Sequence, residues 1–207
     1  SKVDQSQNRT VDQFARALLQ PLPPQSVLIV TNDVAYTATR YLQLCEDFRA
    51  DVTVLPLELM SYLWFKDWAK KYVTEVTFPG DYYLPGKLDG YVASSSKYAG
   101  KTSYALVDFM RENVHRRPLY LTHLIKPIDD GPVEKEFSFL PFGFSFQIIP
   151  KDQVSQLNGK EAQAQSFKNL ELFPVPPPGT FPDDSWEAYI LGMRQDFFER
   201  TAKMIAH

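Results

Sequence analysis

Two short apolar segments decide the expected fold: Ser26-Val-Leu-Ile-Val-Thr31 and Asp51-Val-Thr-Val-Leu55. Each is rich in β-branched residues and apolar along most of its length, as is typical of a strand buried on both faces of a sheet. A helix is expected between them, because apolar residues recur there at helical spacing: Ala38, Tyr41, Leu42, Cys45 and Phe48. The order strand, helix, strand favours a parallel sheet with right-handed crossovers.

The flanking sequence extends this pattern on both sides. Thr10 and Gln13 stand at capping-box spacing and predict the start of a helix that Pro21 ends. Further elements are expected as helices at 57–72 and 102–114, a strand at 118–124, and one strand or a hairpin at 137–149. We therefore expect an open α/β fold: a small, mostly parallel, Rossmann-like sheet flanked by helices.

The last quarter of the chain has a different composition. Residues 151–172 are polar and weakly patterned, and four prolines between Pro174 and Pro178 predict an extended spacer. Asp184, Ser185 and Glu187 then begin an amphipathic helix that we expect to pack back on the domain or to lead into a further helical region. The predicted division is an α/β domain at 1–150, an irregular Pro-rich connector at 151–183 and a C-terminal helix at 184–207.

Composition excludes several classes of function. Of the 207 residues, 44% are apolar, 22 are Lys or Arg and 25 are Asp or Glu, so the net charge of −3 gives no general attraction to nucleic acid. One cysteine excludes an internal disulfide and a multi-cysteine zinc site, and three widely separated histidines predict no metal cluster. No run reaches the roughly 18 apolar residues of a membrane span.

The carboxyl end of the first strand is the expected binding crevice. In open α/β sheets ligands bind outside the strand ends, where Thr31, Asn32 and Asp33 lie. Asp33 could meet a sugar hydroxyl or a cation there, or it could simply cap the following helix. Arg40, two turns into that helix, could turn toward Asp33 or form a surface ion pair.

Aromatic residues gather at two further places. Trp64, Trp68, Tyr82 and Tyr83 suggest stacking on a carbohydrate or peptide, although core packing is the commoner role of aromatic residues at such spacing. The run Phe137–Phe146 could contact a bilayer or another domain, or it could form a hairpin buried against the third helix.

Two single residues carry weaker signals. Cys45 lies beside Phe48 on the expected apolar helix face, and we expect it to be a small buried residue rather than a nucleophile. Asn8-Arg9-Thr10 is an N-glycosylation sequon, so Asn8 is the predicted acceptor if the chain is lumenal or extracellular.

The order of several segments resembles the soluble C-terminal part of the transmembrane protein 260 family, multi-pass protein O-mannosyltransferases of the endoplasmic reticulum. Bacterial relatives of unassigned role also have the Asn-Asp pair and the Arg-x-Asp-Val strand. The resemblance covers about three quarters of the chain and leaves out residues 87–101 and 151–172. It is carried by Asp4–Ser6, Val11–Leu19, Thr31–Asp33, Arg40–Val52, Glu58–Trp64, Phe78–Gly80, Ser138–Gly143, Ile149–Pro150 and, more weakly, Asp184–Trp186 with Phe197 and Phe198.

The resemblance implies a lumenal domain at the endoplasmic reticulum membrane that follows the last membrane helix. Family catalysis uses dolichol-phosphate mannose as donor and an acidic residue in an early lumenal loop, which these residues lack. No catalytic residue and no metal or cofactor site is therefore assigned to this chain. The implied partners are its own membrane-embedded catalytic region and protein acceptors, which in the family are immunoglobulin-like, plexin-type receptor domains.

We therefore expect a domain that is non-catalytic by itself and that supports the membrane core or binds the acceptor. The contact surface is predicted at Asn32, Asp33, Arg40, Tyr82 and Tyr83. Two alternative functions stay open. One is a free-standing α/β enzyme that binds a small ligand in the same crevice. The other is a module that assembles into a larger complex through the aromatic run Phe137–Phe146 and the last helix.

Overall fold

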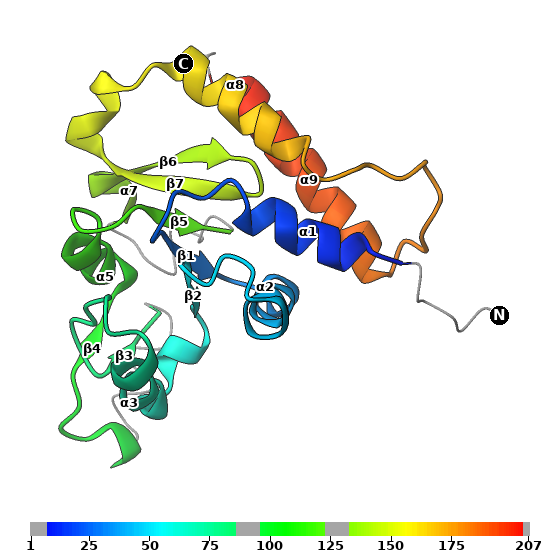
Figure 1. Ribbon diagram of the computed structural model, residues 1–207. Coiled ribbons are helices and arrows are strands. Elements are labelled where there is room, and N and C mark those ends of the chain that lie inside the picture. Colours follow the sequence, from blue (N-terminus) through cyan, green and yellow to red (C-terminus); the bar gives the residue numbers. More distant parts are fainter. Residues whose placement is uncertain (1–7, 86–95, 123–132, 205–207) are drawn as a thin grey trace.

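Five strands form the central sheet, in the order β2-β1-β5-β7-β6 (Figure 1). The computed structural model describes residues 8–85, 96–122 and 133–204. β1 pairs in parallel with β2 and β5, whereas β7 pairs antiparallel with β5 and β6, so β7 runs against the other four strands. The strand bounds are β1 Val27–Val30, β2 Thr53–Pro56, β5 Leu119–Leu121, β6 Phe137–Phe142 and β7 Ser145–Pro150.

Helices cover both faces of this sheet. Leu28, Val30 and Tyr120 lie in one core cluster with residues of α1, α2, α8 and α9, whereas Val27 and Ile29 lie in a second cluster with residues of α3 and α5. The alternation along β1 explains its apolar sequence, because successive side chains point to opposite faces and both faces are buried. The helix bounds are α1 Thr10–Leu19, α2 Asp33–Glu46, α3 Leu63–Tyr72, α5 Leu106–Asn113, α7 Val133–Glu136, α8 Gly159–Leu170 and α9 Trp186–Lys203.

This architecture confirms the predicted α/β class. Short elements complete it: a small parallel sheet of β3 (Tyr82–Tyr83) and β4 (Ser103–Tyr104), and 3-10 helices at Leu59–Ser61, Ser96–Tyr98 and Lys151–Gln156. Among the described residues, no helix is both long enough and apolar enough to cross a membrane.

Arg49 joins the end of α1 to the beginning of β2. Its guanidinium donates to the carbonyl oxygens of Leu19 (2.8 Å), Gln20 (3.0 Å) and Pro23 (3.2 Å). It also forms a two-pronged pair with the Asp51 carboxylate, at 2.8 and 2.9 Å. Carbonyls at the end of a helix lack partners within the helix, so this one side chain completes the end of α1 and fixes the turn that follows.

Asp51 is the other half of this junction. Its carboxylate accepts from the backbone N–H of Gln25 at 3.1 Å as well as from Arg49. Hydrogen bonding from Arg49, assisted by the Gln25 N–H, lowers the pKa of Asp51 to about 2. The charged form of Asp51 is therefore the form that the folded protein stabilises.

The β6–β7 hairpin is held to α8 and α9 by a buried chain of polar groups. The Gly143 N–H donates to Ser166 Oγ at 3.1 Å, and Ser166 Oγ lies 2.9 Å from Thr201 Oγ1. Ser166 and Thr201 are fully buried. Gly143 has a φ of +68°, and a Cβ there would lie 2.7 Å from the Cβ of Asn169. Both the backbone conformation and the close approach of α8 therefore require glycine.

Three local expectations are wrong. The helix at 10–19 begins without a capping box: Arg9 is the residue at the N-cap position and its side chain makes no capping hydrogen bond, while the Thr10 N–H donates to Asn8 Oδ1. Cys45 is exposed rather than buried.

The third concerns the range 151–183, which is not irregular throughout because it contains α8. The phenylalanine run forms a largely buried hairpin, as one of its two interpretations predicts. The Phe144 ring lies 5.2 Å from Phe14 of α1 and 6.3 Å from Phe197 of α9, and Phe137 lies in the core cluster that includes α3. The division into 1–150, 151–183 and 184–207 itself stays a prediction.

Replacing Arg49 by Lys should lower the free energy of unfolding by about 2 kcal/mol, because an ammonium keeps the charge but cannot reach three carbonyls and a carboxylate at once. Urea unfolding at pH 7 measures the change. Arg9→Lys is the matched control, since the exposed Arg9 pairs only with Asp12 in the described structure, and it should cost less than about 0.5 kcal/mol.

The pair of Arg49 and Asp51 also predicts that the stability of the fold depends on pH. Asp51 has a folded pKa of about 2 against an ordinary value of 3.8, so its contribution is complete above pH 3.8 and is lost as the pH falls toward 2. The stability difference between wild type and Asp51→Asn should therefore shrink over this window. An unchanged difference would show that the Asp51 charge is not the stabilising element.

Gly143→Ala should destabilise the protein by more than about 2 kcal/mol, through strain at positive φ and the clash with Asn169. Gly192→Ala is the opposite case, since Gly192 lies inside α9 and a Cβ there meets nothing within 4 Å. It should stabilise the protein by about 0.5–1 kcal/mol. Thermal unfolding of both variants tests the pair, and equal effects would contradict the assignment.

Candidate functional site

The carboxyl ends of β1 and β5 meet at the point where the sheet order reverses. β1 has β2 on one side and β5 on the other, which is the place where open α/β sheets form a crevice. The Thr31 N–H donates to Thr122 Oγ1 at 3.1 Å, and the two hydroxyl oxygens lie 3.2 Å apart. These two threonines tie the strand ends together and fix the start of α2.

Asn32, and not Asp33, is the cap of α2. Its Oδ1 accepts from the Ala35 N–H at 2.8 Å, and its Nδ2 is buried without a hydrogen-bond partner within the described structure. Asp33 is the exposed first residue of the helix. The prediction that Asp33 might serve as the cap is therefore wrong, and its carboxylate faces outward, where the helix N-terminus favours negative charge.

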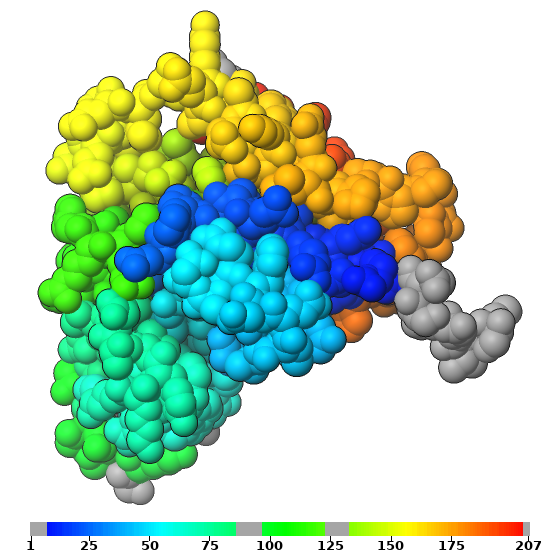
Figure 2. Space-filling model, viewed as in Figure 1, coloured from blue at the N-terminus to red at the C-terminus, as the bar shows by residue number. Residues whose placement is uncertain are grey.

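Asp33 lies on the edge of an open groove between α1 and α2, which we call the α1–α2 groove. The groove has a volume of about 520 Å³. Figure 2 shows the two helices side by side on one face, α1 in dark blue and α2 in lighter blue. The lining of the groove is mainly apolar but includes the carboxylates of Asp12 and Asp33. The lining residues are Val11, Asp12, Asp33, Val34, Thr37, Ala38, Tyr41, Leu42 and Trp186.

Two aromatic side chains in this groove are open to solvent. Tyr41 is 58% exposed and Trp186, the first residue of α9, is 60% exposed. The Trp186 ring also contacts Tyr189 in an edge-to-face arrangement with centroids 5.9 Å apart. The sequence predicts only that a helix begins near Trp186, and it does not indicate that this side chain lies beside α1 and α2.

Arg40 stabilises the loop before β2 and does not line the groove. Its Nη1 donates to Gln43 Oε1 at 2.8 Å, and Gln43 Nε2 donates to the carbonyl oxygens of Arg49 (3.0 Å) and Val52 (2.7 Å). Within the described part of the chain no ion pair joins Arg40 to Asp33. Arg40 therefore orients the amide that holds the loop before β2.

Tyr82 and Tyr83 lie elsewhere. Both are buried, at 6% and 3% exposure, and Tyr83 belongs to the core cluster of α3 and α5. The Tyr82 ring packs against Tyr98 with centroids 4.7 Å apart. The structure thus does not bring the two tyrosines to Asp33, because the central sheet lies between the two core clusters.

Of the two tryptophans expected beside these tyrosines, only Trp68 packs on the core cluster that contains Tyr83. Trp64 is 52% exposed on α3 and stacks with Tyr62, with centroids 6.3 Å apart. Trp68 is half-buried against Phe65. The four aromatic residues therefore do not form one binding surface.

Asn8 has a structural role at the beginning of α1. Its Oδ1 accepts from the Thr10 N–H at 3.2 Å, and its Nδ2, the atom that glycosylation would use, donates to Glu187 Oε1. The side chain therefore links the start of α1 to the first turn of α9. Modification of Asn8 stays a prediction.

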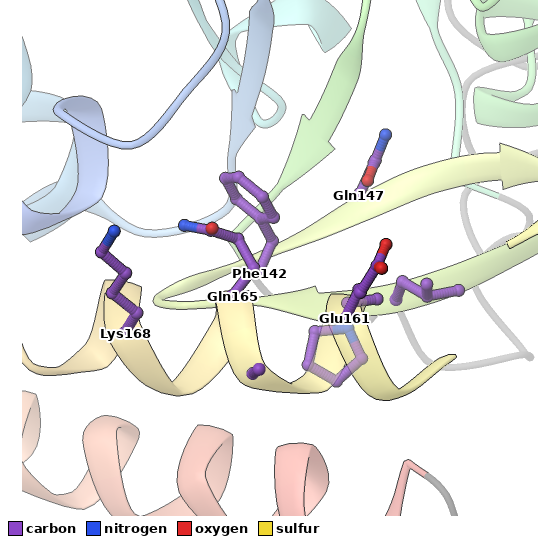
Figure 3. Close-up of a pocket in the computed structure, with 9 residues that line it drawn as sticks. Phe142, Gln147, Glu161, Gln165 and Lys168 are labelled. Carbon is purple, nitrogen blue, oxygen red and sulfur yellow. The ribbon is translucent and has the colours of Figure 1, made fainter. Parts of the chain in front are cut away.

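A second hollow lies between the β6–β7 hairpin and α8, and we call it the hairpin pocket. Figure 3 shows polar side chains of α8 and β7 around the Phe142 ring. The pocket has a volume of about 550 Å³ and is lined by Leu140, Pro141, Phe142, Gln147, Glu161, Ala162, Ala164, Gln165 and Lys168. The sequence did not indicate it, because most of its polar residues lie in the weakly patterned stretch 151–172.

Other acidic residues with shifted pKa values belong to ion pairs outside both hollows. The pKa of Asp81 is lowered by the Thr102 N–H and by Lys66, and that of Glu136 is lowered by Arg111. Within the described ranges, no group of three or more His, Cys, Asp or Glu residues could hold a metal ion.

Two curated relatives share this sequence pattern over much of the chain. The chain is 30% identical, over 203 residues, to a Dictyostelium discoideum protein named protein O-mannosyl-transferase tmem260. It is 29% identical, over 151 residues, to the Mus musculus protein of that name. These matches cover 98% and 73% of this chain but only 23% and 20% of the relatives.

The predicted resemblance to the TMEM260 protein O-mannosyltransferases is therefore confirmed. The chain spans less than a quarter of the length of the relatives it matches. No protein-family model and no solved structure matches it.

The capping assignment makes a direct prediction. Asn32→Ala should lower the free energy of unfolding by about 1 kcal/mol, because the first turn of α2 loses its side-chain acceptor. Asp33→Ala should cost only about 0.3–0.5 kcal/mol, since it removes a favourable charge near the helix N-terminus but no cap. Urea unfolding of both variants at low salt measures the difference, and the reverse order would restore Asp33 as the cap.

Proposed function

We propose that this chain, which resembles the TMEM260 protein O-mannosyltransferases along nearly its whole length, is a non-catalytic lumenal module of such a transferase. Its task is to hold the protein acceptor through the α1–α2 groove. The chemistry then belongs to a membrane-embedded region that uses dolichol-phosphate mannose. The endoplasmic reticulum is the corresponding location, with this module on the lumenal side.

The exposed aromatic groove is the observation that carries this proposal. Tyr41 and Trp186 are more than half exposed, although aromatic rings of this size are usually covered in a free-standing domain. Tyrosine and tryptophan are also the residues that most often dominate binding energy at protein interfaces. An apolar groove rimmed by polar groups is typical of a protein-contact site.

Several residues in the segments that carry the resemblance stabilise the fold. Arg49 and Asp51 close the junction between α1 and β2, and Arg40 with Gln43 braces the same loop. These side chains serve the fold. We therefore assign recognition to Tyr41 and Trp186, which belong to the same matching segments but line the exposed groove that this framework positions.

The acceptor that we assign to the groove is an immunoglobulin-like, plexin-type receptor domain. A hydrophobic residue on a loop or strand of such a domain would enter between α1 and α2. Asp33 at the edge of the groove, without a hydrogen-bond partner in the described structure, would accept from a donor of the acceptor. The other partner is the transferase's own membrane region.

A chimaera tests the proposal in cells. The segment of the mouse relative that matches this chain is replaced by this chain, and O-mannose on a co-expressed plexin-type domain is measured by mass spectrometry. The double change Tyr41→Ala and Trp186→Ala should lower mannosylation about tenfold or more at equal protein abundance, because two interface anchors are lost.

Trp64→Ala is the matched control for this experiment. Trp64 is 52% exposed, close to the 60% of Trp186, but it lies on α3, so its loss should leave mannosylation unchanged. Biolayer interferometry of the purified chain against the acceptor domain gives an independent reading of binding. Unchanged mannosylation and unchanged binding by the double variant would overturn the proposal.

A further inference from the structure

We infer that the hairpin pocket binds a short, uncharged glycan. This site shares no residue with the α1–α2 groove, and the inference does not depend on the function proposed for that groove. It rests on the kinds of side chain that meet in the pocket, on the hydrogen-bonding capacity they leave open, and on the rigidity of the two walls.

Three polar residues of α8 form one wall of the pocket. Glu161, Gln165 and Lys168 are separated by four and three residues, so they lie on one face of the helix over about 10 Å. Gln147 of β7 also lines the pocket, and Figure 3 shows the Phe142 ring beside Gln165 of α8.

The polar groups keep unused hydrogen-bonding capacity. Within the described structure no hydrogen bond is found for the side chains of Gln147, Glu161 and Lys168. Gln165 donates once, from Nε2 to Asn169 Oδ1 at 2.7 Å, which leaves its own oxygen as an acceptor. The pocket therefore offers amide donors, an ammonium donor, amide acceptors and a carboxylate acceptor within one hollow.

This mixture fits a ligand with many hydroxyl groups. A hydroxyl donates and accepts at once, so it can use both the carboxylate and the amides. Glu161 and Lys168 carry opposite charges, so the pair gives no preference for an anion or a cation. Leu140, Pro141 and Phe142 supply an apolar floor against which the C–H face of a sugar ring can pack.

The two walls are held in place before any ligand arrives. The Gly143 N–H donates to Ser166 on the buried side of α8, and Ser166 contacts Thr201 of α9. The hairpin and α8 therefore cannot move apart without breaking buried hydrogen bonds. A preformed site loses less conformational entropy on binding, which helps a small polar ligand to reach measurable affinity.

Nuclear magnetic resonance of the ¹⁵N-labelled chain tests the site directly. The probes are methyl α-D-mannopyranoside, methyl α-D-glucopyranoside and N,N′-diacetylchitobiose, each titrated to about 50 mM. At least one probe should shift the side-chain amide signals of Gln147 and Gln165 saturably, with a millimolar dissociation constant.

Variants of α8 identify the pocket as the binding place. Glu161→Gln should weaken binding about tenfold, because it replaces a charged acceptor by a neutral amide of the same shape. Glu171→Gln, an equivalent change at the exposed end of α8 and outside the pocket, should leave binding unchanged. Ala164→Trp places a large ring on the exposed lining and should abolish the shifts without disturbing the core.

Three results would overturn the inference. One is the absence of saturable shifts with all three probes, and another is equal binding by wild type, Glu161→Gln and Ala164→Trp. The third is tighter binding of inorganic phosphate at the same amide signals, which would make the pocket an anion site. The double variant Tyr41→Ala and Trp186→Ala should titrate as wild type, so failure here and failure of the proposed function are distinguishable.

Discussion

The two-pronged contact between Arg49 and Asp51 is the constraint on which the rest of the structure depends. One guanidinium satisfies the last carbonyls of α1 and the turn after it, while its carboxylate partner holds the Gln25 N–H next to β1. Helix α1 is thereby fixed against the sheet at the level of β1 and β2. A lysine or a neutral side chain could not meet these groups together, because only the planar guanidinium presents several donors in fixed directions.

The α1–α2 groove follows from this junction. Once α1 is fixed at its end, its packing against α2 and α9 leaves a hollow that Trp186 borders and that the core does not fill. Asn8 and Glu187 link the beginning of α1 to α9 at the other end. Helix α1 is thus held in place at both of its ends, and the exposed aromatic residues beside it lie on a surface of defined shape.

The hairpin is a second, separately held unit of the surface. Gly143 allows the β6–β7 turn to approach α8 closely, and buried hydroxyls of Ser166 and Thr201 complete the contact. Small residues and hydroxyls at this contact leave the larger polar side chains of α8 on its outer face. The same helix therefore packs on the core with one face and lines the hairpin pocket with another.

The sequence by itself determined the α/β class, because the apolar strands at 27–30 and 53–56 can be stable only inside a sheet covered on both faces. It also indicated the start of α2 near Asp33. Only the tertiary structure decided that Asn32 is the cap of α2 and that Arg40 donates to Gln43. It also decided that Tyr82 and Tyr83 are buried away from Asp33. Trp186 and α8 reach their sites through contacts between segments distant in the chain. Local periodicity cannot specify such contacts, since it reports which face of an element is apolar but not which partner covers it.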